Sequence, residues 1–104
     1  NILIVDDLIS TGTSLVTATN VLREKGALEV SAAIIHPVLP GAAVATINES
    51  SLKTLWVSDS IALSDEAKDS PKIKVVSLSG LLGEAIKRIH ADTPVSILFE
   101  YSEK

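Results

Sequence analysis

Apolar and polar residues follow one another in blocks that predict strands followed by helices. Residues 2–5 form an unbroken Ile-Leu-Ile-Val run, which is typical of a strand covered on both faces in a parallel sheet. From Leu15 the apolar positions change to a helical spacing, with Ala18 and Leu22 on the same face. We therefore expect a buried strand that leads into a helix over residues 14–25.

The same alternation continues to the end of the chain. It predicts further strands at residues 30–36, 55–57 and 73–77. It predicts further helices at residues 41–51 and 78–90. The polar stretch 64–72 indicates a solvated connection, and the apolar segment 95–99 indicates an edge strand or a piece that docks on a partner.

This order of elements predicts an α/β fold: a parallel sheet of about four strands with flanking helices and right-handed crossovers. The chain has 104 residues, of which 46% are hydrophobic and only 3% aromatic, so we expect one domain over residues 1–104 with an aliphatic core. The sequence lacks Met and begins directly before a strand that requires neighbours on both sides. We therefore expect the domain to be truncated at its amino-terminal side.

Composition excludes several classes of partner. The formal net charge is −4 and no Lys or Arg cluster is present, so we expect no nucleic-acid binding. The chain has no Cys, which excludes disulfides and thiolate catalysis. No apolar run approaches the roughly 20 residues that cross a bilayer, and we expect a cytoplasmic protein with no membrane partner.

The residues after the first strand carry the candidate chemistry. Asp6 and Asp7 follow the apolar run, at the end of the strand where open α/β sheets bind ligands. Carboxylates are ligands that Mg²⁺ prefers, and the first N–H groups of a helix favour an anion. The predicted anion-binding turn consists of Ser10, Thr11, Gly12, Thr13 and Ser14.

Two later strands also end in polar residues, His36 and Asp59. Because the carboxyl ends of parallel strands meet at one edge of the sheet, we expect these side chains to converge with Asp6 and Asp7. For His36 alone we favour hydrogen bonds within its loop over a catalytic role.

The segment from residue 2 to residue 14 resembles the phosphoribosyl diphosphate motif of the type I phosphoribosyltransferase fold. Downstream, the segments 36–42, 72–82, 85–90 and 95–99 are similar, in the same order, to the carboxyl-terminal portion of the ribose-phosphate pyrophosphokinase family. That family of enzymes transfers the diphosphoryl group of ATP to ribose 5-phosphate and requires Mg²⁺. The resemblance therefore implies a partial type I phosphoribosyltransferase-like fold and a part in this reaction.

The resemblance also implies roles for individual residues. Asp6 and Asp7 would hold the ribose hydroxyls, directly or through Mg²⁺, and the turn from Ser10 to Ser14 would cradle the 5-phosphate. In the family, an amino-terminal domain binds most of the ATP, and a mobile loop upstream of the motif supplies basic catalytic residues. We expect neither in this chain. We therefore assign no catalytic residue within this chain, expect it to be inactive alone, and expect a homo-oligomer.

Two positions depart from the family pattern. Ser10 stands where the family usually has an acidic residue, and Thr13 stands where it commonly has Gly. If the backbone of Thr13 required a positive φ, its side chain would cost about 1 kcal/mol.

Other functions fit parts of the sequence. A response-regulator receiver domain also opens on a strand and an acidic pair, and would be phosphorylated on Asp59, but it has no use for the hydroxyl-rich turn after Asp7. A dinucleotide-binding domain is weaker because the turn lacks the three-glycine spacing. A non-catalytic regulatory homologue and another phosphoribosyltransferase remain alternatives.

Overall fold

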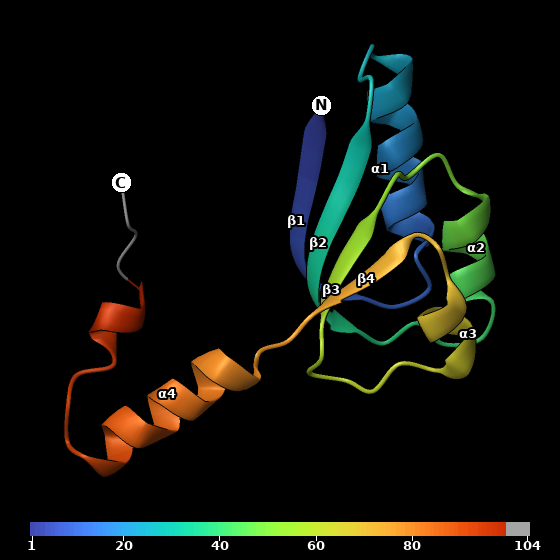
Figure 1. Ribbon diagram of the computed structural model, residues 1–104. Helices are drawn as coiled ribbons and strands as arrows, with labels where there is room; N and C mark the ends of the chain where they lie inside the picture. The colour runs from blue at the N-terminus through green and yellow to red at the C-terminus, as the bar shows by residue number, and fades with distance from the viewer. Residues whose placement is uncertain (100–104) are drawn as a thin grey trace.

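The computed structural model describes residues 1–99 and contains one parallel sheet. Its strands are β1 (Ile2–Ile9), β2 (Val30–Pro37), β3 (Leu55–Ser58) and β4 (Ile73–Val76). They lie in the order β1-β2-β3-β4, and each neighbouring pair is parallel (Figure 1). The predicted α/β class and four-stranded parallel sheet are confirmed.

The helices are α1 (Thr13–Glu24), α2 (Ala43–Glu49), α3 (Asp65–Asp69) and α4 (Ser79–His90), followed by a short 3-10 helix, η1 (Ser96–Phe99). The prediction for residues 95–99 as an edge strand is therefore wrong. The prediction for residues 64–72 missed α3. Ser64 caps this helix by accepting a hydrogen bond from the N–H of Ala67 at 3.1 Å, and Ala67 is buried.

The core lies between the sheet and the helices α1 and α2, which pack on one face of it (Figure 1). The fully buried side chains are aliphatic for the most part, as the low aromatic content predicts. The largest of them are Ile47, Leu52, Leu55, Val30, Val44, Val57, Thr19 and Pro37.

The second face of the sheet is open within residues 1–99, so the expectation that the first strand is covered on both faces is wrong. Leu3 and Val5 of β1 are 57% and 72% exposed. The reason is topological: the crossovers through α1, α2 and α3 all advance in one direction across the sheet, and right-handed connections then place these helices on the same face.

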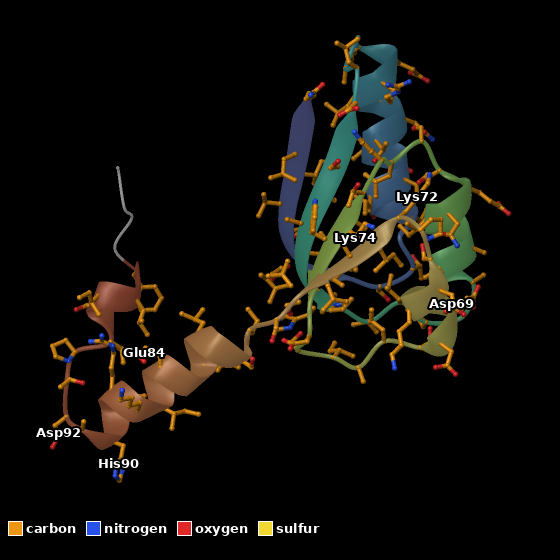
Figure 2. All side chains as sticks on the ribbon, viewed as in Figure 1. Asp69, Lys72, Lys74, Glu84, His90 and Asp92 are labelled. Atoms are coloured by element: carbon orange, nitrogen blue, oxygen red, sulfur yellow. The ribbon has the colours of Figure 1, made fainter. Side chains whose placement is uncertain are left out.

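The predicted helix α4 forms but extends away from the sheet (Figure 1). It has no buried residue, and Leu82, Ile86 and Ile89 remain exposed on its apolar side. Figure 2 shows Glu84 and His90 on this helix, far from Lys74 in β4 and Lys72 just before it. The amphipathic pattern therefore predicted the helix correctly, although no described element covers its apolar side.

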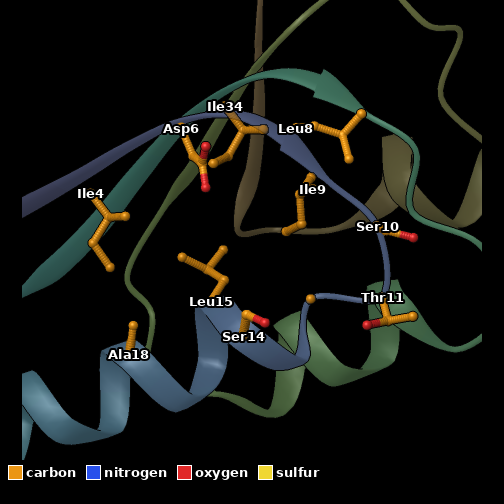
Figure 3. Close-up of a pocket in the computed structure, with 11 residues that line it drawn as sticks. Ile4, Asp6, Leu8, Ile9, Ser10, Thr11, Ser14, Leu15, Ala18 and Ile34 are labelled. Atoms are coloured by element: carbon orange, nitrogen blue, oxygen red, sulfur yellow. The ribbon is translucent and has the colours of Figure 1, made fainter.

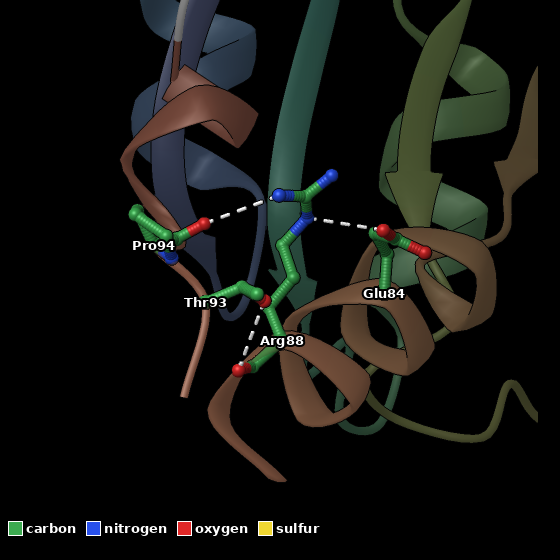
Figure 4. A network of polar contacts seen from close by, with 4 residues as sticks. All are labelled: Glu84, Arg88, Thr93 and Pro94. Carbon is green, nitrogen blue, oxygen red and sulfur yellow. Dashed lines mark hydrogen bonds and ion pairs between the residues drawn. The ribbon is translucent and has the colours of Figure 1, made fainter. Parts of the chain in front are cut away.

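Arg88 links α4 to the turn that follows it. Its Nε donates to Glu84 Oε1 at 3.0 Å, and its Nη1 donates to the carbonyl of Pro94 at 3.2 Å (Figure 4). Thr93 Oγ1 donates to the carbonyl of Arg88 at 3.2 Å. These contacts order the end of α4 locally.

Asp59 fixes the start of α4. Its carboxylate accepts hydrogen bonds from the N–H of Leu78 at 2.8 Å and from Ser77 Oγ at 2.6 Å. The bond from the Leu78 backbone, followed by that from Ser77, lowers the pKa of the Asp59 carboxyl.

Candidate functional site

The two adjacent acids lie on opposite faces of β1. The strand continues to Ile9, so Asp6 and Asp7 lie within it rather than after its end. Asp6 pairs in register with Ile34 and shares the helix-covered face of the sheet. Asp7 faces the open side, and its N–H donates to Asp6 Oδ1 at 2.8 Å.

Gly12 makes the turn from β1 into α1. It is the N-cap of the helix, has a φ of 84°, and as a glycine has no side chain that could cap the helix. A Cβ at this position would lie 3.1 Å from Ile47 Cδ1. Glycine is therefore required here both by the backbone conformation and by the neighbouring side chain.

Thr13 is the first residue of α1 and does not have a positive φ. The possible strain at this departure from the family pattern therefore does not arise. The left-handed position of the turn is Gly12, one residue earlier.

The N-terminus of α1 presents hydrogen-bond donors. The first N–H groups of a helix lack partners within it, and the macrodipole there favours negative charge. Thr11 Oγ1 lies 3.3 Å from Thr13 Oγ1 and accepts a long hydrogen bond of 3.5 Å from the N–H of Thr13. Ser10 and Ser14 are exposed next to these two threonines. Several hydroxyl and amide donors therefore lie close together at the start of α1.

A cavity of about 310 Å³ lies between β1 and α1 (Figure 3). Of the predicted binding residues, it is lined by Asp6, Ser10, Thr11, Gly12 and Ser14. Asp7 and Thr13 are not among the lining residues. The rest of the wall is apolar and consists of Ile4, Leu8, Ile9, Leu15, Ala18 and Ile34. The sequence motif did not reveal that Ala18 and Ile34 complete this wall, because they lie outside the motif, in α1 and β2.

Asp59 does not converge on this cavity as expected, and His36 pairs in register with Leu8 of the cavity wall but is not among the lining residues. His36 Nδ1 lies 2.9 Å from Ser60 Oγ, and Asp59 is engaged by Ser77 and Leu78. Asp59 follows β3, which β2 separates from β1. The hydrogen bond of His36 agrees with the structural role that we favoured for it.

The oxygen ligands at the cavity suit a cation that is also coordinated by a bound substrate. Within residues 1–99 no group of three or more His, Cys, Asp or Glu side chains could hold a metal ion. Mg²⁺ commonly binds through one or two carboxylates together with water and substrate oxygens. Asp6 at the cavity wall can supply one such carboxylate, with the hydroxyls of the turn nearby.

Comparison with known proteins gives a consistent result. Residues 1–100 match the family described as phosphoribosyl synthetase-associated domain. The chain is 48% identical over 101 residues to ribose-phosphate pyrophosphokinase 2 of Enterococcus faecalis, covering 97% of this chain and 31% of that protein. It is 47% identical over 98 residues to ribose-phosphate pyrophosphokinase of Oceanobacillus iheyensis, covering 94% of this chain and 31% of that protein.

The fold is also similar to a solved structure. The crystal structure of phosphoribosylpyrophosphate synthetase from Mycobacterium smegmatis matches with a TM-score of 0.81 and 30% sequence identity, over 86% of this chain and 30% of that one. The chain thus spans less than a third of the proteins that it resembles. Across residues 1–99, every helix is too short or too polar to span a membrane.

Proposed function

The chain belongs to the phosphoribosyl synthetase-associated domain family, and from this premise we propose that it forms the ribose 5-phosphate-binding part of a ribose-phosphate pyrophosphokinase. One observation carries the proposal: one cavity has the Asp6 carboxylate on one wall and the N-terminus of α1 on another. A carboxylate accepts hydrogen bonds from sugar hydroxyls, and a helix N-terminus binds phosphate. The pair suits a sugar phosphate.

In the proposed reaction the 1-hydroxyl oxygen of ribose 5-phosphate attacks the β-phosphorus of ATP. A bond forms between this oxygen and the β-phosphorus, the bond from the β-phosphorus to the oxygen of the α-phosphate breaks, and AMP leaves. The hydroxyl proton is released. Phosphoryl transfer depends mainly on positioning and charge stabilisation, so the work of this chain is to fix the sugar phosphate.

Individual residues have distinct parts in this binding. Asp6 orients the ribose ring through its hydroxyls, while Thr11, Gly12 and Ser14 hold the 5-phosphate with hydroxyl and amide donors. We propose that Asp6, with Asp7 as a secondary candidate, also contributes a ligand to Mg²⁺. When bound, Mg²⁺ neutralises negative charge on the phosphate oxygens. ATP and the basic catalytic groups would come from regions of a full-length enzyme that the match does not cover.

Two of the alternatives lose support. The family match over residues 1–100 excludes a receiver domain, and the Asp59 carboxylate already accepts hydrogen bonds from Ser77 and Leu78. The relatives are ribose-phosphate pyrophosphokinases, which argues against another phosphoribosyltransferase. The remaining alternative, a non-catalytic regulatory homologue, can be distinguished from the proposed function by measuring enzymatic activity.

We expect the chain alone to form no AMP from ATP and ribose 5-phosphate above background. Placed in the Enterococcus faecalis relative instead of the matching segment, it should restore AMP formation in a coupled assay. Asp6→Asn in the same chimera should lower that rate at least about tenfold, the loss expected for one charge-assisted hydrogen bond. Full turnover by the isolated chain would contradict the proposal, and a folded but inactive chimera would favour the regulatory homologue.

We also propose that the protein forms a homo-oligomer, as the resemblance to its family implies. Sedimentation velocity should then show a species heavier than one chain. A purely monomeric profile at all concentrations would contradict this proposal. Both substrates are charged metabolites, and we propose a cytoplasmic location that cell fractionation can test.

A further inference from the structure

The turn that we propose binds the phosphate packs against a side chain from another element. The site of a Cβ on Gly12 lies 3.1 Å from Ile47 Cδ1, 3.6 Å from Ile47 Cγ1 and 3.9 Å from Ile9 Cδ1. Ile47 belongs to α2 and is 0% exposed. The side chain of Ile47 therefore packs closely against the backbone of Gly12, at the residue where the chain turns into α1.

Ile47 is itself held in place. Its carbonyl accepts hydrogen bonds from the N–H of Ser50 at 3.1 Å and from Ser50 Oγ at 2.6 Å, which close the end of α2. Close packing in a core leaves such a side chain little freedom to move. The side chain of Ile47 therefore has little freedom to move away from the turn.

The same β2–α2 segment also holds the other end of the turn. The N–H of Val38 donates to the carbonyl of Ile9 at 2.9 Å, immediately before Ser10. The next residue, Leu39, is buried and has a φ of 46°, a conformation that non-glycine residues rarely adopt. A strained, buried residue persists only where its surroundings require it.

We propose that Ile47 is a positioning residue for the sugar-phosphate site, acting through Gly12. This inference rests on the proposed function, because it assigns a role in that same site. Ile47 does not line the cavity. It limits how far the Gly12 backbone can move toward α2, and so sets the direction of the donors on Thr11 and Ser14, which line the cavity.

The test compares two buried residues on the same helix. Ile47→Val removes the methyl group that lies closest to Gly12, and Val44→Ala removes two methyl groups from a side chain that is 1% exposed. Affinity for ribose 5-phosphate is measured by calorimetric titration, and the backbone amides of Thr11, Gly12 and Thr13 are followed by NMR in the free protein. Thermal unfolding of both variants reports on stability.

We expect Ile47→Val to weaken ribose 5-phosphate binding at least threefold and to shift the three amide signals. Val44→Ala should lower the melting temperature more but leave affinity and these signals near wild type. Equal affinity losses in the two variants, or unchanged binding by Ile47→Val, would overturn the positioning role alone. Absence of binding by the wild-type chain would overturn the proposed function and this inference with it.

Discussion

Replacing Gly12 with alanine is expected to weaken ribose 5-phosphate binding at least about tenfold, which corresponds to about 1.4 kcal/mol. The left-handed backbone, with a φ of 84°, costs an alanine about 1 kcal/mol. The new Cβ would also meet Ile47 Cδ1 at 3.1 Å, so the turn or α2 must shift. Calorimetric titration of the variant against wild type measures the effect.

Gly26 offers a matched control for this substitution. It follows α1 at its other end, has a φ of 104°, and has no atom within 4 Å of the position of a Cβ. Gly26→Ala should therefore lower the free energy of unfolding by a similar backbone cost while leaving affinity unchanged. If both variants lose affinity equally, the loss reflects stability and the role of the Gly12 turn is contradicted.

Asp6→Asn is expected to reduce ribose 5-phosphate affinity by about tenfold to a hundredfold in the presence of Mg²⁺. A hydrogen bond that involves a charged group contributes about 1.5 to 3 kcal/mol, and the amide also loses a charge that favours the cation. Asp7→Asn removes the same charge one residue away, on the open face of the sheet. Its effect should be several times smaller.

The comparison between these two variants separates local contact from general charge. Both change the net charge equally, so a difference in affinity reports on the face of β1 from which each side chain projects. An Asp7→Asn effect equal to or larger than that of Asp6→Asn would contradict the assignment of the cavity as the sugar site.

The local pattern of the sequence was sufficient to predict most elements of the fold. Apolar runs located all four strands, and the spacing of Leu15, Ala18 and Leu22 located α1. The pattern did not reveal that one face of β1 is open, because an apolar run of four residues looks the same whether one or both faces are covered within the described chain. The short helix α3 was missed because polar residues and a Ser cap also fit a loop.

The candidate site could be predicted from the sequence only in part. The turn from Ser10 to Ser14 is continuous in sequence, so its chemistry is visible without a structure. The support that Ile47 gives to Gly12 joins residues that are far apart in sequence, and no local signal reveals it. The expected convergence of Asp59 failed because strand order, rather than the shared edge of the sheet, sets how far a polar tip lies from β1.

The most direct test of the central claim is calorimetric titration of the wild-type chain with ribose 5-phosphate and, separately, with ribose, each with and without Mg²⁺. Saturable binding of ribose 5-phosphate that Mg²⁺ strengthens, and that exceeds ribose binding at least about tenfold through the phosphate contacts at the α1 N-terminus, is the predicted result. Equal affinity for ribose and ribose 5-phosphate, or no binding of either, would contradict it.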